Sequence, residues 1–169
     1  WAHVTTAAFA LPLAEVIHLG AAVKHQFVSG ANSTNSVTMN AGVVIHPYPF
    51  LSLGFSGNNV IGVYNRDVPR FFTASVSGQI LGQLSPALDV RMDFNASAPR
   101  VSIAGGLEWL IAETIPVRAG YTWDGIDGRQ YLHMGLGYFN QGSGVDIAYR
   151  HEFTGGNGRM IALTLKLQI

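Results

Sequence analysis

Residues 159–169 read RMIALTLKLQI, and their side chains alternate between an apolar and a more polar set. The apolar positions are Ile161, Leu163, Leu165, Leu167 and Ile169. Successive side chains of a strand point to opposite sides, so a period of two is the pattern of a β-strand with two different faces. The stretch therefore predicts an amphipathic strand at this end of the chain.

The same alternation continues upstream through most of the sequence. Further stretches with a period of two cover residues 17–27, 39–46, 51–56, 72–80, 88–95, 101–111, 115–123, 132–138 and 145–150. Turn-forming segments such as NSTNS, DGIDG, NQGSG and TGGNG separate them, and no helical period is found. The pattern predicts ten antiparallel strands, with residues 2–11 as a weaker eleventh.

The composition indicates where such strands would lie. Hydrophobic residues make up 48% of the 169 residues and charged residues only 12%, whereas soluble domains carry about 25% charged residues. Mean hydropathy is +0.23, yet no run of uncharged apolar residues is long enough for a transmembrane helix. We therefore expect residues 1–169 to form a single all-β domain, an antiparallel transmembrane β-barrel, because its strands spread apolar residues over many short segments.

The positions of the charges support this expectation. Charged residues fall on the polar register of the strands or in turns, loops and strand ends, and none interrupts the middle of an apolar face. A charge on a lipid-facing position at the bilayer centre costs roughly 2–4 kcal/mol. A soluble β-sandwich is the alternative, but its strands would be shorter and its outer face richer in charge.

The polar register gives the candidate site. We expect the inward face to carry the pore-lining residues Lys24, Asp89, Arg91, Asp93, Glu108, Arg118, His133, Asp146, Arg150, Glu152 and Lys166. These side chains form either a salt-bridged network or a lining that screens solutes. Arg118 lies on the strand between those of Glu108 and His133, which favours cross-strand pairing. The balance of positive and negative residues argues against strong ion selectivity.

The strand directions predict which connections share a side of the membrane. If the last strand ends at the periplasm, the extracellular connections are 28–36, 57–70, 95–100, 124–130 and 154–158. The periplasmic turns then lie near 46–50, 83–87, 112–114 and 140–143. The first set is longer on average, as bacterial barrels require. An even strand count leaves two alternatives for residues 1–13: a periplasmic or plug segment of a ten-stranded barrel, or an extra strand of a chain that lacks further strands upstream.

The longest connection, 57–70, reads GNNVIGVYNRDVPR and contains several apolar residues. It is an ordinary surface loop, a constriction folded into the lumen, or a binding site for a protein partner outside. The periplasmic turns are a second candidate surface for such a partner.

The C-terminal part of the chain resembles a known group of membrane proteins. The segments GLEWLIAETIPVRAGYTWDG, LHMGLGYFNQGSGVDIAYRHEF and RMIALTLKLQI, within residues 104–169, are similar to the end of a PorV/FadL-like outer-membrane barrel. This resemblance implies the C-terminal portion of a 14-stranded barrel. FadL-like members pass hydrophobic small molecules, and PorV-like members serve as scaffolds in secretion or surface attachment. The chain departs from many barrels in ending in Ile169 rather than an aromatic residue.

Motifs of catalysis and metal binding are missing from the sequence. It contains no HxH, HExxH or GxSxG spacing, and Gly135 to Gly137 lie within a strand with no helix after them. We expect no catalytic residue, metal or cofactor, and the zero net charge gives no sign of nucleic-acid binding. The predicted location is the outer membrane of a Gram-negative bacterium, in contact with its lipid and lipopolysaccharide. The predicted function is a passive channel or transporter for small, including hydrophobic, molecules, and the alternative is a scaffold barrel in an envelope or secretion complex.

Overall fold

The computed structural model describes residues 2–29, 34–62, 70–94, 100–140, 142–154 and 158–167. The regular structure in these ranges consists of eleven antiparallel β-strands in one sheet. They are β1 (Ala2–Ala14), β2 (Ile17–Val28), β3 (Thr34–Tyr48), β4 (Leu51–Gly62), β5 (Phe71–Gly78), β6 (Leu84–Asp93), β7 (Arg100–Ile111), β8 (Ile115–Asp124), β9 (Arg129–Phe139), β10 (Ser143–Glu152) and β11 (Arg159–Leu167). The prediction of an all-β antiparallel fold is confirmed.

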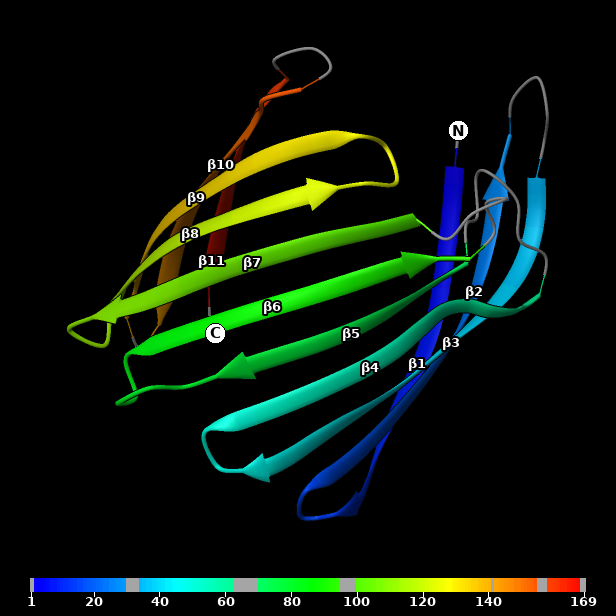
Figure 1. Cartoon of the computed structure of the whole chain (residues 1–169), viewed down its shortest axis with the longest axis horizontal. Coiled ribbons are helices and arrows are strands. Elements are labelled where there is room, and N and C mark those ends of the chain that lie inside the picture. Colours follow the sequence, from blue (N-terminus) through cyan, green and yellow to red (C-terminus); the bar gives the residue numbers. More distant parts are fainter. Residues whose placement is uncertain are drawn as a thin grey trace. The chain divides into compact units, whose positions relative to one another are not determined.

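The order of the strands in the sheet is the order of the strands in the chain (Figure 1). The order is linear, and β1 and β11 stand at its two ends. The stretch 2–11, for which the sequence left two alternatives open, lies in β1 and pairs with β2. Across the described ranges, no helix has the length and apolar character needed to cross a membrane.

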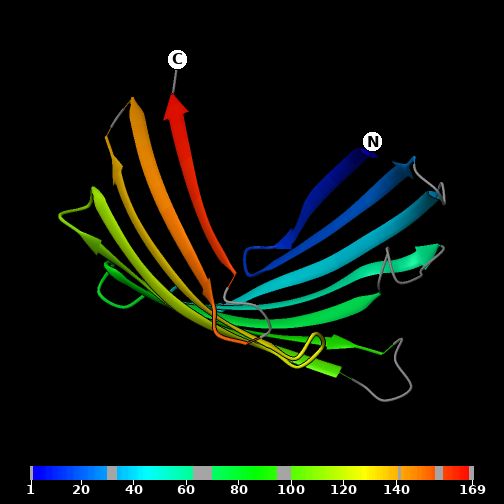
Figure 2. The same ribbon diagram turned by 90° about the horizontal axis from the view of Figure 1, so that it is seen from above.

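Contacts between Cα atoms divide the chain into two compact units. Unit 1 comprises Trp1–Ser75 and Arg91–Arg100, and unit 2 comprises Val76–Val90 and Val101–Ile169. Unit 1 therefore contains β1 to β4, the first part of β5, the last part of β6 and the first residue of β7, and unit 2 contains the rest of β5, β6 and β7 with β8 to β11. Seen from above, consecutive strands lie side by side within each unit (Figure 2).

Every second connection is short, as expected, but several predicted bounds were wrong. Residues 34–36 belong to β3 and residues 57–62 to β4, so the predicted loops 28–36 and 57–70 are shorter than proposed. Asn35, Ser36, Gly57 and Gly62 pair in the ladders, although residues of these types are typical of turns. The predicted turns 46–50 and 83–87 and the loop 124–130 likewise give residues to the adjoining strands. Residues 30–33, 63–69, 95–99, 141 and 155–157, which fall in the predicted connections, lie outside the described residues.

The apolar faces of the strands are largely uncovered. Phe9 on β1 is 67% exposed and Leu163 on β11 is 63% exposed, and exposed large hydrophobic residues occur on every strand. Thr38 and Pro116 are the largest fully buried side chains among the described residues. A soluble domain buries most large apolar side chains in a packed core. Each unit therefore presents an extensive exposed apolar surface.

Candidate functional site: a polar cluster on one face of the sheet

The structure places the predicted pore-lining residues in both units. Unit 1 holds Lys24 on β2 with Arg91 and Asp93 on β6, and unit 2 holds the other eight. In unit 2 these are Asp89 on β6, Glu108 on β7, Arg118 on β8, His133 on β9, Asp146, Arg150 and Glu152 on β10, and Lys166 on β11. Unit 2 therefore contains the larger part of the candidate site.

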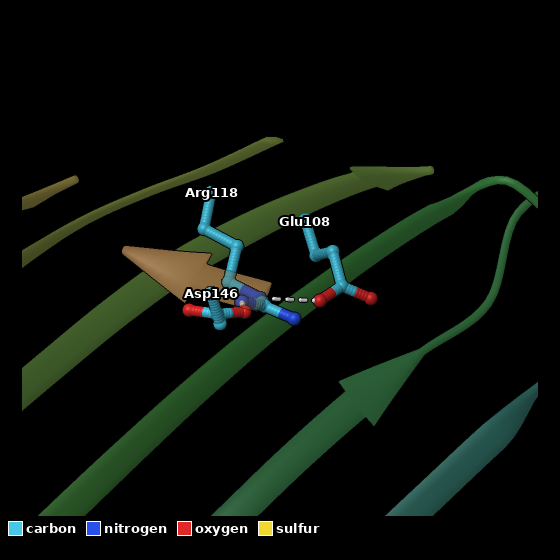
Figure 3. A network of polar contacts seen from close by, with 3 residues as sticks. All are labelled: Glu108, Arg118 and Asp146. Carbon is cyan, nitrogen blue, oxygen red and sulfur yellow. Dashed lines mark hydrogen bonds and ion pairs between the residues drawn. The ribbon is translucent and has the colours of Figure 1, made fainter. Parts of the chain in front are cut away.

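Arg118 is the centre of a three-residue cluster in unit 2. Its Nε atom donates a hydrogen bond of 2.6 Å to Oε2 of Glu108, and its Nη1 atom donates to Oδ2 of Asp146 (Figure 3). Glu108 lies directly opposite Arg118 in the β7–β8 ladder. Asp146 comes from β10, which is separated from β8 by β9. Arg118 thus connects three strands of the polar face, and the expected pairing with Glu108 is confirmed.

Two glycines of β9 let the Arg118 side chain cross that strand. Gly135 is opposite Arg118 in the β8–β9 ladder, and Gly137 is opposite Asp146 in the β9–β10 ladder. A Cβ atom at Gly137 would lie 3.0 Å from Asp146 Oδ2, and one at Gly135 would lie 3.3 Å from Arg118 Cβ. Any larger residue at these positions would therefore fill the space through which the guanidinium reaches Asp146.

A hollow of about 330 Å³ adjoins the cluster. Its lining includes Glu108, Arg118, Asp146 and His133 together with small residues such as Gly120. His133 does not contact Arg118 in the way that its neighbouring strand position suggested. Its Nε2 atom instead lies 3.1 Å from the hydroxyl of Thr122, which is the hydrogen-bond partner that the structure gives its ring.

A second polar layer on the same face of unit 2 contains the remaining charged residues of β10. The guanidinium of Arg150 lies 5.1 Å from the ring centroid of Tyr131, and Nε of Arg129 lies 3.7 Å from Oε1 of Glu152. Nζ of Lys166 lies 5.2 Å from the centroid of Phe139. Each of these basic side chains of unit 2 therefore lies beside a carboxylate or an aromatic ring.

Among the predicted residues of unit 1, Lys24 lies on β2, and Arg91 and Asp93 lie on β6. The Arg91 guanidinium lies 4.2 Å from the centroid of Phe71, and its Nε atom is buried without a hydrogen-bond partner. Lys24 is opposite Thr38 in the β2–β3 ladder. Within unit 2 the structure brings Glu108, Arg118 and Asp146 together, and His133 lines the same hollow.

The aromatic partners of the cations were missed by the sequence reading. Phe71, Tyr131 and Phe139 contact Arg91, Arg150 and Lys166. The sequence did contain a signal for these contacts. All three aromatic residues occupy polar-register positions of their strands, where an alternating pattern predicts a polar side chain and a ring can instead contact a cation. The contact of Lys166 with Phe139 crosses β10, where Gly144 is opposite both residues, so finding it required the register of three strands.

The cluster offers fixed charge and hydrogen bonding. One guanidinium faces two carboxylates, so the three ionised groups together carry one net negative charge. Within the described ranges, no group of three or more His, Asp or Glu side chains is placed to hold a metal ion. The arrangement can orient a polar solute or cross-link the strands.

No family model matches this chain, and a search of curated proteins finds no match either.

Proposed function

We propose that this chain forms part of the wall of a transmembrane β-barrel in a bacterial outer membrane and works as a passive channel for small molecules. The observation that carries the proposal is the uncovered apolar face, on which large hydrophobic residues of every strand are exposed. Lipid chains would cover such a face without any further protein layer. The resemblance of residues 104–169 to PorV/FadL-like barrels supports the same assignment.

The opposite face supports a path for solutes. Small residues such as Gly106, Gly120 and Gly135 leave the hollow of unit 2 open beside the Arg118 cluster. Charged groups of both signs line it, so we expect weak discrimination between cations and anions. Hydrogen-bonding groups at fixed positions would let small polar solutes pass along this face, driven by their concentration gradient.

The test is electrical. The purified full chain, with its mass and oligomeric state determined in detergent, is inserted into planar bilayers, and single-channel conductance and reversal potential are measured in a salt gradient. We expect steady conductance with weak ion selectivity. The double variant Glu108→Gln with Asp146→Asn should shift the reversal potential towards anions, because it leaves Arg118 as an uncompensated positive charge. The apolar-face variant Leu163→Ala is the matched control and should leave the reversal potential unchanged.

A scaffold barrel is the second candidate, and one observation favours it. Arg118 is held by two carboxylates from two different strands, which is the arrangement expected of a cross-link that stiffens a sheet. Absence of conductance from protein shown to be folded and inserted would reject the channel. A search for a partner at the connections between strands would then follow, with the residue 57–70 region and the short turns as the first surfaces tested.

A further inference from the structure

Two histidines meet at one end of unit 1. His18 lies near the start of β2, and His46 lies near the end of β3. The centroids of their rings are 5.3 Å apart, and the ring planes are inclined by 74°. The β1–β2 and β3–β4 turns lie at the same end of the unit (Figure 1). Two imidazoles from neighbouring strands therefore share one place close to these turns.

The strand register explains why the two rings meet. His18 is directly opposite Val44 in the β2–β3 ladder. His46 follows Val44 by two positions, so it lies on the same side of the sheet, diagonally across from His18 and within reach of a ring. The backbone N–H of His46 also donates a hydrogen bond of 2.8 Å to the carbonyl oxygen of Val16, just before β2. The ladder and this bond therefore hold both histidine backbones in place.

The imidazole of His46 is oriented by a neighbour on β4. The β3–β4 ladder shifts its register between Ile45 and Tyr48, which leaves His46 and Pro47 opposite the single residue Ser52. A bulge of this kind redirects the side chains beside it. Nδ1 of His46 lies 2.9 Å from Oγ of Ser52. When Nδ1 donates its proton to this hydroxyl oxygen, Nε2 carries a free lone pair, and a bond to the other ring nitrogen is how proteins orient metal-bound histidines.

The imidazole of His18 has open space beside it. It is half-buried and borders a hollow of about 490 Å³ that small residues such as Gly20 and Gly54 line in unit 1. The residues opposite His18 are Pro12 on β1 and Val44 on β3, and neither brings a positive charge to the pair. The hollow therefore leaves room next to His18 for an ion together with water molecules.

The separation of the two rings is that of two ligands on one metal ion. In a tetrahedral zinc site, each ligating nitrogen is about 2.0–2.1 Å from the ion and each imidazole centroid is about 3.2 Å from it, so two centroids are about 5 Å apart. The 5.3 Å between the rings of His18 and His46 agrees with this value. Imidazole is also a ligand that zinc, copper and nickel ions favour.

Such a pair leaves no spacing motif in the sequence. HxH and HExxH place both histidines on one strand or helix, whereas His18 and His46 come from two strands. Edge-to-face packing of two rings gives a similar separation. The bond from His46 to Ser52 and the hollow beside His18 are the features that favour a metal ion over ring packing alone.

We propose that His18 and His46 together bind a divalent transition-metal ion of the zinc and copper class, with water molecules as the remaining ligands. The ion would join β2 to β3 next to the β1–β2 and β3–β4 turns. Since the chain supplies two ligands to this ion, binding depends on both imidazoles, and Ser52 acts as a positioning residue for one of them. Such binding is independent of solute passage through a barrel.

Copper(II) is the probe, because its electron paramagnetic resonance spectrum shows splittings from each nitrogen bound to it. The purified full chain, without an affinity tag and with the exposed His3 replaced by alanine in every sample, is folded in detergent at mildly alkaline pH, since metals bind neutral imidazole. The test variants are His18→Ala and His46→Ala. The matched control is His25→Ala, which removes another histidine of β2, whose Nε2 atom lies 2.8 Å from Oδ1 of Asn35.

We expect splittings from two imidazole nitrogens in the parent protein and in His25→Ala. His18→Ala and His46→Ala should each lose one of these nitrogens and bind copper about tenfold more weakly or worse. Ser52→Ala keeps both imidazoles and should retain the two-nitrogen spectrum with weaker binding. A single-nitrogen spectrum in the parent protein, or a two-nitrogen spectrum that survives both histidine substitutions, would overturn the inference. The parent spectrum decides even where a variant does not fold.

Discussion

Gly137 is a position where a single methyl group should disturb the polar cluster. A Cβ atom there would lie 2.9 Å from Cγ of Pro116 and 3.0 Å from Oδ2 of Asp146. We predict that Gly137→Ala lowers the free energy of unfolding by about 1–3 kcal/mol, the usual cost of overpacking. Urea unfolding in lipid vesicles measures the change. Gly142→Ala is the matched control, because nothing lies within 4 Å of a Cβ atom at Gly142, and an equal loss in both variants would contradict the argument.

Arg118 is the residue whose loss should cost most in the cluster. Arg118→Met removes the cation that lies between the carboxylates of Glu108 and Asp146, so the two negative charges repel each other. We predict that the free energy of unfolding falls by about 1–2 kcal/mol. The triple variant that adds Glu108→Gln and Asp146→Asn should recover most of it, because the repulsion is then absent. If the triple variant is as unstable as Arg118→Met, the cost comes from lost packing of the arginine stem and not from charge.

These contacts show which residue-level features a sequence can predict. The Glu108–Arg118 pair follows from strand register, since the two positions face each other across a short hairpin. The contact with Asp146 does not follow from adjacency, because β9 lies between the two strands. This contact depends on the glycines at two successive polar positions of β9. Their role can be recognised only when the register of β8, β9 and β10 is known.

Among the elements, the β7–β8 hairpin has a turn that its residues do not favour. Ala112 and Glu113 have φ of 49° and 59°, and the N–H of Thr114 bonds to the carbonyl oxygen of Ile111. Positive φ at both central residues is the geometry for which Asn-Gly is preferred. We predict that Ala112→Asn with Glu113→Gly raises the free energy of unfolding by about 1 kcal/mol.

The measurement is again urea unfolding, with Gly142→Ala as an unrelated turn variant for reference. A loss of stability in the Asn-Gly variant would show that the turn is fixed by its surroundings and not by local conformational preference. The side chain of Glu113 makes no ion pair among those the structure describes, which is why its removal should cost little.

At the level of strands, the period-two alternation predicted which strands exist better than it predicted where each strand begins and ends. The strands follow the period of two, but β3 and β4 extend into segments that read as loops because asparagine, serine and glycine are common in turns. The irregularity of β4 at Asn58–Val60, which stand opposite the single residue Asn40, could not be recognised in the sequence either. Asn58-Asn59 is a turn signal, and only the register against β3 shows that the strand continues on both sides of it.

For the whole molecule, the two faces of the sheet should respond differently to charge. Leu163 and Thr164 are neighbours on β11, on the apolar and polar registers respectively. We predict that Leu163→Arg lowers stability in a bilayer by roughly 2–4 kcal/mol and that Thr164→Arg costs much less. Unfolding in vesicles compares the two variants, with Thr164→Val as a neutral reference. Equal costs at the two positions would contradict a lipid-facing apolar surface.

The identity of strand order and chain order has a consequence for how the protein is assembled. In the part of the chain that the structure describes, each strand pairs only with strands that precede or follow it directly in the sequence, so these ladders form between segments close together along the chain. Such a meander has a low contact order for an all-β protein, and no strand must wait for a distant segment before its ladder can form. Growth by addition of one hairpin after another is therefore available to the nascent chain, and a cut in any one connection would separate a single ladder while leaving every other pair of neighbours covalently linked.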